Sequence, residues 1–276
     1  MLEAKLNSAV VLRRIFDCIR EIISDGNIDV DSGGISLQAL DGNHVALVHL
    51  RLVENGFAHF RCDRPRALGV NIASMTKAFK SCGNHDSVLI QNEDDKDLIT
   101  FIFENQVEGR VSTFSLKLMS IVQDALSIPE NVDGFDAQVT ISSKEFANIC
   151  KQMNEFSDTV KIEIDRNGIK FSTQGDVGYG EVLLRPRDPI SDADMGVKIK
   201  ANSPIKQSYA TKYLNIFAKS GCLSDAISFG LSKNRPIEIR YEIRDGTGID
   251  EGKSFGSVLG ELKFYLAPKV DDDAEE

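Results

Sequence analysis

The sequence has few of the residues that mark catalytic or metal-binding proteins. Tryptophan is absent, aromatic residues make up 7% of the 276 residues, and the four histidines are scattered. No histidine has the spacing of a zinc site, and we expect His49 and His59 to be ordinary strand residues. Neither a nucleophile-elbow nor a zinc-protease motif occurs. We therefore expect no enzyme activity, no metal and no cofactor.

Cysteines and long apolar runs are also scarce. The five cysteines show no Cys-x-x-Cys spacing, which is typical of a reduced intracellular protein. No apolar run approaches the ~20 residues of a membrane helix. Glu3, Arg13 and Arg14 interrupt the first apolar stretch, so it does not resemble a signal peptide. With a mean hydropathy of −0.17, we expect a globular protein with no membrane partner.

Two short motifs resemble ligand sites but have the wrong spacing. Residues 252–254 end like a phosphate-binding loop, yet Thr247 stands where its first glycine belongs, and the segment 245–257 is expected to link two strands. The acidic run at 93–95, with Asp97, lacks the alternating ligands and central glycine of a calcium loop. We interpret the acidic run as a solvated hairpin turn.

The apolar pattern of residues 11–50 returns in residues 145–184, at a shift of 134 positions. Further pieces match in the same order at shifts of 138 and 146. Agreement of apolar positions with few identities indicates a duplicated structural unit. The matched pairs include Leu12 with Phe146, Ile15 with Ile149, Phe16 with Cys150, Ile19 with Met153, Ile22 with Phe156, Phe79 with Phe217, Phe103 with Tyr241, Leu116 with Leu262 and Leu118 with Phe264.

Periodicity predicts the same order of elements in each half: a helix, several strands, another helix and several strands. Hairpin-length connections favour antiparallel sheets, so the expected fold class is α+β with two topologically similar domains. Helices are expected at 8–24, 72–82, 142–155 and 208–220. Strands are expected within 27–62, at 87–91, 98–104 and 110–117, within 159–185, and at 226–232, 236–243 and 258–266.

Composition divides the chain into four parts. Pro129, Asn131 and Gly134 break regular structure within 119–135, which we interpret as an interdomain connecting loop. The loop separates an N-terminal domain, residues 1–118, from a C-terminal domain, residues 136–270. The last residues, 271–276, are expected to form an acidic disordered tail.

Charge is divided unevenly between the expected helices and the rest of the chain. A net charge of −10 alone disfavours nucleic acid as a partner. The four helices, however, hold nine basic and four acidic residues, which leaves +5 on the helices and −15 elsewhere. A solvated face would explain any one helix, but the bias recurs in all four, and the basic positions do not superpose under the repeat shift. Helices that all carry positive charge, but at different repeat positions, suit contact with a DNA phosphate backbone. The nine candidates are Arg13, Arg14, Arg20, Lys77, Lys80, Lys144, Lys151, Lys212 and Lys219.

Six sequence blocks carry a resemblance to a known family. They are MLEAKL at 1–6, GISLQALDGNHVALVHL at 34–50, FRCDRPRALGVNIASMTKAFK at 60–80, LSIPE at 126–130, EFANICKQM at 145–153 and FYLAPKV at 264–270. Over nearly its whole length the chain resembles the proliferating cell nuclear antigen family of eukaryotic sliding clamps. The resemblance implies the DNA-clamp fold in a homotrimeric ring around duplex DNA, with sheets outside and helices lining the hole. It also implies a nuclear processivity factor of DNA replication and repair.

In that family, an edge strand of the first domain pairs with one of the second domain of the next subunit. The matching segments are 111–117 and 177–185, with Phe114 and Tyr179 as packing residues and two glycines that let the backbones approach. The resemblance implies as subunit interface Val111, Phe114, Leu116, Gly178, Tyr179, Gly180 and Val182.

The family also binds short peptides, with a glutamine and a hydrophobic-aromatic helical turn, in a pocket beneath the connecting loop. Through such peptides the resemblance implies DNA polymerase, flap endonuclease, DNA ligase and the clamp loader as partners. From the residues alone, Leu47 and Leu126 would suit a core position equally well. The pocket residues implied are Leu40, His44, Val45, Leu47, Leu126, Ile128, Pro129, Pro236, Tyr265, Ala267, Pro268 and Val270.

Three positions depart from the family pattern, and three alternatives stay open. Arg166 replaces a lysine that receives ubiquitin in the family, although Lys170 is nearby; Asn148 replaces a basic residue of the third helix; and the segment 245–257 is longer than usual. The nearest alternative is a subunit of a heterotrimeric checkpoint clamp, with the same fold but no self-trimerisation. A nucleotide-hydrolysing enzyme using 248–254 and a purely protein-binding scaffold are the others.

Overall fold

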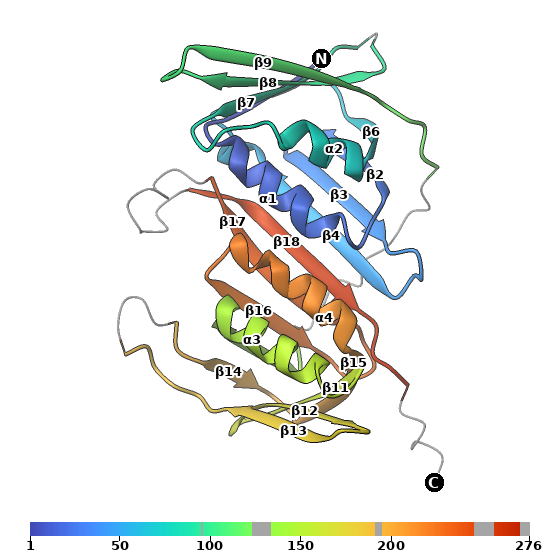
Figure 1. Ribbon diagram of the computed structural model, residues 1–276, viewed down its shortest axis with the longest axis vertical. Coiled ribbons are helices and arrows are strands. Elements are labelled where there is room, and N and C mark those ends of the chain that lie inside the picture. Colours follow the sequence, from blue (N-terminus) through green and yellow to red (C-terminus); the bar gives the residue numbers. More distant parts are fainter. Residues whose placement is uncertain (95, 123–133, 191–194, 246–256, 271–276) are drawn as a thin grey trace. The chain divides into compact units, whose positions relative to one another are not determined.

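The computed structural model describes residues 1–94, 96–122, 134–190, 195–245 and 257–270 (Figure 1). Contacts divide the chain into two units. Unit 1 comprises Met1–His44, Val48–Leu126 and Glu242–Leu262, and unit 2 comprises Val45–Leu47, Ser127–Tyr241 and Lys263–Glu276. Two helices and antiparallel strands in each half confirm the α+β class and the repeated element order. The domain boundaries expected from composition stay predictions, and no described helix is long and apolar enough to cross a membrane.

The first half of the chain holds two α-helices, one short 3-10 helix (Glu54–Gly56) and nine strands among its described residues. β5, β1, β7, β8 and β9 form an antiparallel five-stranded sheet in that order, and β2 pairs with both β3 and β6. The elements are β1 (Leu2–Leu6), α1 (Ala9–Ile19), β2 (Asp25–Asp31), β3 (Gly34–Leu40), β4 (Ala46–Val53), β5 (His59–Cys62), β6 (Arg66–Asn71), α2 (Ile72–Phe79), β7 (Ser87–Asn92), β8 (Leu98–Asn105) and β9 (Arg110–Lys117).

The core of unit 1 lies between its strands and the buried sides of α1 and α2. Apolar residues at helical spacing in α1 place Leu12 and Phe16 against the same interior as Met75 of α2 and Phe101 of β8. Phe79 of α2 is fully buried, and its ring lies 5.4 Å from that of Phe16 and 5.0 Å from that of Phe101. Aromatic packing therefore ties both helices to the five-stranded sheet.

The second half repeats this arrangement. β13, β12, β11 and β15 form an antiparallel four-stranded sheet in that order, and β10 pairs with β14 and β16. The elements are β10 (Ala137–Ser142), α3 (Ser143–Asn154), β11 (Thr159–Asp165), β12 (Gly168–Gly175), β13 (Gly178–Leu184), β14 (Lys198–Ala201), β15 (Ile205–Ala210), α4 (Thr211–Ala218), β16 (Ala226–Leu231), β17 (Ile237–Arg244) and β18 (Val258–Leu266).

Three expectations about element bounds were wrong. α4 begins at Thr211 and not at 208, because residues up to Ala210 pair with β11 as part of β15. α1 ends at Ile19, where Arg20 already occupies the cap position. Strands β6, β10, β14 and β15 were not expected, since each has at most six residues, too few for a long apolar alternation.

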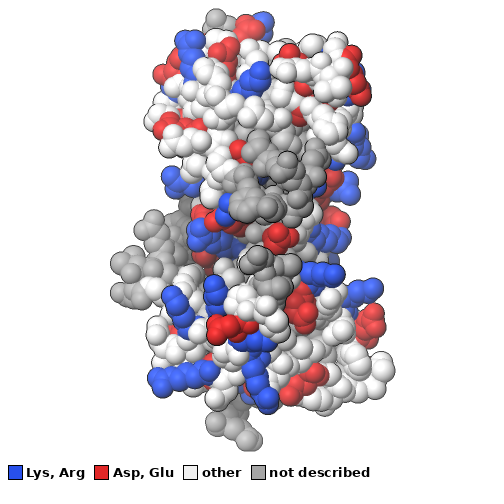
Figure 2. All heavy atoms as spheres, turned by 90° about the vertical axis from the view of Figure 1, so that its left-hand side faces the viewer, with Lys and Arg blue, Asp and Glu red and all other residues white. Residues whose placement is uncertain are grey.

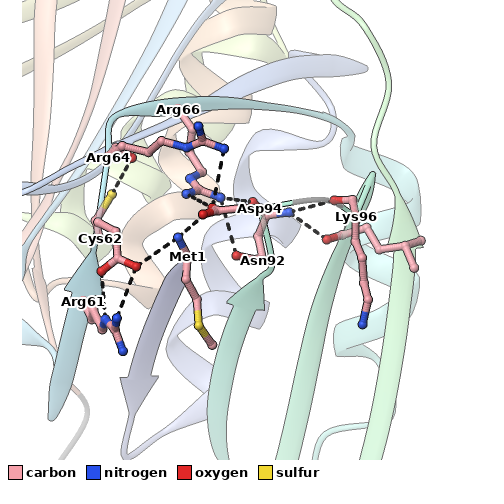
Figure 3. A network of polar contacts seen from close by, with 10 residues as sticks. Met1, Arg61, Cys62, Arg64, Arg66, Asn92, Asp94 and Lys96 are labelled. Atoms are coloured by element: carbon pink, nitrogen blue, oxygen red, sulfur yellow. Dashed lines mark hydrogen bonds and ion pairs between the residues drawn. The ribbon is translucent and has the colours of Figure 1, made fainter.

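The acidic turn between β7 and β8 is part of a polar network rather than only solvated (Figure 3). Asp94 accepts hydrogen bonds from the Met1 amino group at 2.6 Å and from Arg66 at 2.5 Å. These two contacts lower the pKa of Asp94 to about 2. Arg66 also donates to Asn92 at 2.6 Å, so the network joins Met1, which precedes β1, to strands β6 and β7. The carboxylate therefore has its partners within the protein, and a cation is not needed to explain the acidic run.

Candidate nucleic-acid interface

In unit 1, α1 and α2 lie side by side (Figure 1), and none of their basic residues is buried. Lys77 and Lys80 are exposed and three positions apart, so their side chains are neighbours on the helix surface. Lys80 follows the last residue of α2, where a cation is favoured by the helix dipole. Arg13 is half-buried and donates to the Cys82 carbonyl at 3.1 Å, so it is held more rigidly than the lysines.

The remaining basic residues of α1 are Arg14, which is half-buried, and Arg20, which is exposed. Arg20 lies 3.8 Å from Asp17, an exposed ion pair that is worth little and leaves the guanidinium accessible. Arg13 and Arg20 are seven positions apart and therefore point to nearly the same side of the helix, about 10 Å apart along its axis.

In unit 2, α3 and α4 are joined by a hydrogen bond of 3.2 Å from the Asn215 amide to the Cys150 carbonyl. Each helix carries two exposed lysines at a spacing of seven: Lys144 and Lys151 on α3, and Lys212 and Lys219 at the start and end of α4. This spacing places each pair on one side of its helix, two turns apart.

The spacing of seven recurs in α1, α3 and α4, although the pairs start at different points of the repeat. An amphipathic helix with two cations two turns apart can contact two phosphates without reading a base. Figure 2 shows one face of the molecule, on which Lys and Arg side chains lie among Asp and Glu.

Each unit also presents the edge of a sheet. β9 is the last strand of the five-stranded sheet and β13 is the last of the four-stranded sheet. Val111 of β9 is 65% exposed and Tyr179 of β13 is 59% exposed, which is unusual for apolar and aromatic strand residues. Phe114 is half-buried and packs on Phe103 at 5.9 Å. An exposed apolar strand edge is a template for pairing with another chain.

The other residues implied for this interface lie on the same two strands. Leu116 of β9 and Val182 of β13 are half-buried. Gly178 has a φ of +147°, a conformation that other residues rarely adopt, so its role is set first by the turn into β13. A Cβ at Gly180 would lie 3.4 Å from Thr173 of the neighbouring strand β12, in ordinary contact.

The first residue of β9 is held by a buried carboxylate that sequence reasoning missed. Asp86 is 2% exposed and accepts hydrogen bonds from the Gly83 amide at 2.8 Å, Asn105 at 2.9 Å and Arg110 at 3.2 Å. Burial raises the pKa of Asp86, but these hydrogen bonds and the Arg110 charge outweigh burial and lower it overall. The end of the exposed edge is thus fixed in place.

The residues expected to form a peptide pocket are placed only in part. Tyr265 donates to Glu238 at 2.9 Å, and the Ala267 amide donates to the Val45 carbonyl at 3.0 Å. His44 adopts a left-handed conformation with a φ of 58°. Leu40, Leu47 and Pro268 are half-buried, and Pro236 and Val270 are exposed. Leu126, Ile128 and Pro129 lie outside the described residues, as do residues 246–256 and the acidic tail 271–276.

Two comparisons with known proteins bear on this arrangement. Residues 1–126 match the family model "Proliferating cell nuclear antigen, N-terminal domain", and residues 127–250 match the model of its C-terminal domain. The chain is 55% identical over 275 residues to "Proliferating cell nuclear antigen 1" of Plasmodium falciparum, covering 100% of this chain and 99% of that protein. It is 38% identical over 273 residues to "Proliferating cell nuclear antigen" of Chaetomium thermophilum, covering 99% and 100% of the two chains.

These matches identify the chain as a DNA sliding clamp, a processivity factor without enzyme activity that serves DNA replication and repair. The chain belongs to the proliferating cell nuclear antigen family. Membership confirms the expected fold, the expected DNA partner and the expectation of no catalytic step. In the part of the chain that the structure describes, no cluster of His, Cys, Asp or Glu is suited to a metal ion.

Proposed function

We propose that three copies of this chain close into a ring by pairing β9 of one copy with β13 of the next. The two strands lie on different units and are not equivalent, so the contact is heterologous, and such contacts generate rings when the rotation closes. The number three follows the family. The observation that carries the proposal is the pair of exposed edges marked by Val111 and Tyr179.

The internal repeat supports this pairing. At the repeat shifts, β4 corresponds to β13 and β18 corresponds to β9. β4 and β18 are neighbours in the sheet order, and a Cβ at Gly260 of β18 would lie 1.9 Å from the Arg51 carbonyl of β4. One strand pair is thus completed inside the chain, whereas its repeat counterparts, β13 and β9, are left at sheet edges. If β13 of one copy paired with β9 of the next, this pair would be equivalent to the β4–β18 pair inside the chain.

In this ring the basic helices line the hole and hold duplex DNA without reading its sequence. Positive side chains close to the phosphates dominate, because the charges of the acidic outer surface are screened over ~8 Å at physiological salt. The clamp then tethers a polymerase to its template and raises the effective concentration of that polymerase at the primer end.

Partner proteins bind through short peptides in the pocket formed by the residues listed above, which include Val45, Tyr265 and Val270. Replicative polymerase, flap endonuclease, DNA ligase and the clamp loader are the proposed partners, and the nucleus is the proposed site of action. The turn at 165–168 has Arg166, which cannot form an isopeptide bond, so we expect no ubiquitin at this turn position.

The solution mass of the purified chain tests the ring. We expect about three chains in the wild type, and one chain in Val111→Glu and in Tyr179→Glu, because a buried unpaired carboxylate would oppose strand pairing. Val107→Glu is the control, since Val107 is 90% exposed and lies in the β8–β9 turn, outside the ladder. A wild-type mass of one chain would favour the checkpoint-clamp alternative.

A further inference from the structure

One buried carboxylate holds both ends of the β8–β9 turn, which leads into a strand that the proposed ring uses. Asp86 is 2% exposed and lies just before β7. Its carboxylate accepts hydrogen bonds from the Asn105 amide at 2.9 Å and from the Arg110 guanidinium at 3.2 Å. Asn105 is the last residue of β8 and Arg110 is the first residue of β9. Asp86 therefore ties the end of one strand to the beginning of the next.

The turn between the two strands belongs to the same network. The backbone amide of Glu108 donates to the Asn105 side-chain carbonyl at 2.9 Å, and the Glu108 carboxylate lies 3.6 Å from the Arg110 guanidinium. Asn105 and Arg110 also form the last pair of the β8–β9 ladder. The end of a ladder opens at little cost unless other contacts tie it down. Here those contacts converge on Asp86.

Asp86 is itself held by α1 and by the loop before it. The Asp86 carbonyl accepts a hydrogen bond of 2.8 Å from the Ala9 amide, at the start of α1. Arg13, one turn further along α1, donates to the Cys82 carbonyl at 3.1 Å. The amide of the next residue, Gly83, donates to the Asp86 carboxylate at 2.8 Å. The carboxylate is thus placed by a helix that packs on the core of unit 1.

The network leaves room for one geometry. A Cβ at Gly83 would lie 2.9 Å from an Asp86 carboxylate oxygen and 3.2 Å from the Arg110 guanidinium, so glycine permits the close approach of these groups. A buried carboxylate costs free energy unless its oxygens are paired. Its donors must therefore stay in place, and they fix the start of β9 along with the carboxylate.

The internal repeat indicates why β9 has such a support. Its counterpart β18 lies between β17 and β4 in the sheet order, whereas β9 is the last strand of its sheet (Figure 1). In unit 2 the place of Asp86 is taken by Asp225, which is exposed. The buried carboxylate therefore stands beside the strand that has a neighbour on one side, and the exposed one belongs to the unit whose matching strand has two.

We infer that Asp86 is a positioning residue for ring closure, which holds the start of β9 in the place where the next copy pairs. Val111 follows Arg110 directly and is 65% exposed, so a shift of Arg110 moves this apolar residue of the edge. A strand that adds to an edge needs the amides and carbonyls of that edge in regular register. Asp86 acts from inside unit 1, and the inference rests on the proposed function because it concerns the strand that the ring uses.

The test measures the protein concentration at which half of the full-length chains are in rings, by solution mass during stepwise dilution. Asp86→Asn removes the charge that Arg110 faces, and Gly83→Ala places a methyl group against the carboxylate. Each variant should raise this concentration by about tenfold or more, since weakening a buried hydrogen bond to a charged group has an effect of this order.

Two matched controls lie in the turn after β3, a strand of the nine-stranded sheet. Asp41 is 5% exposed and accepts a hydrogen bond of 3.2 Å from the Asn43 amide, so Asp41→Asn also disturbs a buried carboxylate. A Cβ at Gly42 would meet nothing within 4 Å, so Gly42→Ala adds a methyl group without a close contact. Neither control should change the concentration at which rings dissociate. Urea unfolding reports folding stability separately, and Asp41→Asn should lower that stability without opening the ring.

The outcomes separate this inference from the ring itself. If the wild type has the mass of one chain at every concentration, the ring proposal is wrong and the inference falls with it. If the wild type forms rings and both test variants dissociate at the wild-type concentration, the inference alone is overturned. An equal effect of Asp41→Asn on the ring would overturn it as well. Circular dichroism checks the fold, and Gly83→Ala decides the outcome if Asp86→Asn does not fold.

Discussion

The two units have the same packing and different charges. Phe79 of α2 and its repeat partner Phe217 of α4 are both fully buried, and each contacts an aromatic ring of a strand. The cations of the helices, by contrast, occupy different repeat positions. Packing constrains shape to within a methylene group, whereas a phosphate backbone needs only a positive charge nearby. The duplication therefore preserved the core and left the charges free to move.

The largest expected effect comes from reversing the lysines of both units. Lys77→Glu with Lys80→Glu in unit 1, and Lys212→Glu with Lys219→Glu in unit 2, should each lower the salt slope of DNA binding by at least about 1.8. The four changes together should remove measurable binding and polymerase stimulation on a primed template. Equal losses of salt slope from the two lysine pairs would indicate that both units contact DNA, although their lysines occupy different repeat positions. A loss confined to one pair would refute it.

Removal of the matched core rings should have the next largest effect. Phe79→Ala and Phe217→Ala each leave a cavity at a fully buried site, at a cost of about 3–5 kcal/mol in unfolding free energy. Urea unfolding measures both. The exposed Val107 gives the control, since Val107→Ala should change stability by about 0.5 kcal/mol or less. Unequal losses would show that the two cores are not equivalent.

A third comparison concerns two aspartates at equivalent places. The carbonyls of Asp86 and Asp225 accept hydrogen bonds of 2.8 Å from Ala9 and Ser143, at the starts of α1 and α3. Asp86 is buried and Asp225 is exposed. Asp86→Asn weakens the contacts with Arg110 and should cost about 1–3 kcal/mol, whereas Asp225→Asn should cost about 0.5 kcal/mol or less.

The pH dependence follows from the lowered pKa of Asp86. A carboxyl whose pKa is lower in the folded state stabilises the protein above the ordinary carboxyl pKa of about 3.9, and this contribution is lost as the pH falls through the folded value. The wild type should therefore lose stability in acid more steeply than Asp86→Asn. Identical acid unfolding curves for the two proteins would contradict the proposed role of this carboxylate.

The smallest effect is expected at a cross-strand ion pair that only unit 2 has. Lys170 and Glu163 are partners in the β11–β12 ladder, with 2.6 Å between the ammonium and the carboxylate. The equivalent pair in the β2–β3 ladder is Asp29 with Ser36. Lys170→Ser should lower the melting temperature only slightly, and Ser36→Lys should raise it by a similar or smaller amount. Thermal unfolding at low and high salt measures both changes, which should shrink as salt rises.

Hydrophobic periodicity was sufficient to predict the helices and most strands, because the buried sides repeat in both halves. It failed at β6, where Pro65, Gly69 and Asn71 interrupt any apolar alternation. At the start of α4 it assigned residues 208–210 to the helix, yet Tyr209 is fully buried in the strand that pairs with β11. Backbone pairing overrode the local pattern at both places.

The basic helix residues were also predictable, because a charge bias is visible in sequence. The polar partners were not. Asp86 lies 19 positions from its partner Asn105 and 24 positions from its partner Arg110. No sequence periodicity connects these residues. The exposure of β9 could be predicted only from the family resemblance. The internal repeat would have predicted a buried strand, because the repeat partner of Leu116 is Leu262, which is fully buried.

The first residues of the expected connecting loop are held against β6 and β2, in unit 1. The Met119 amide donates to the Gly69 carbonyl at 2.9 Å, and Asn27 donates to the Ile121 carbonyl at 3.3 Å. A Cβ at Gly69 would lie 2.0 Å from the Met119 carbonyl. Residues 119–121 therefore belong to the packed structure of unit 1, although composition assigns them to the loop. Replacing Gly69 by any larger residue would push this short segment away from β6.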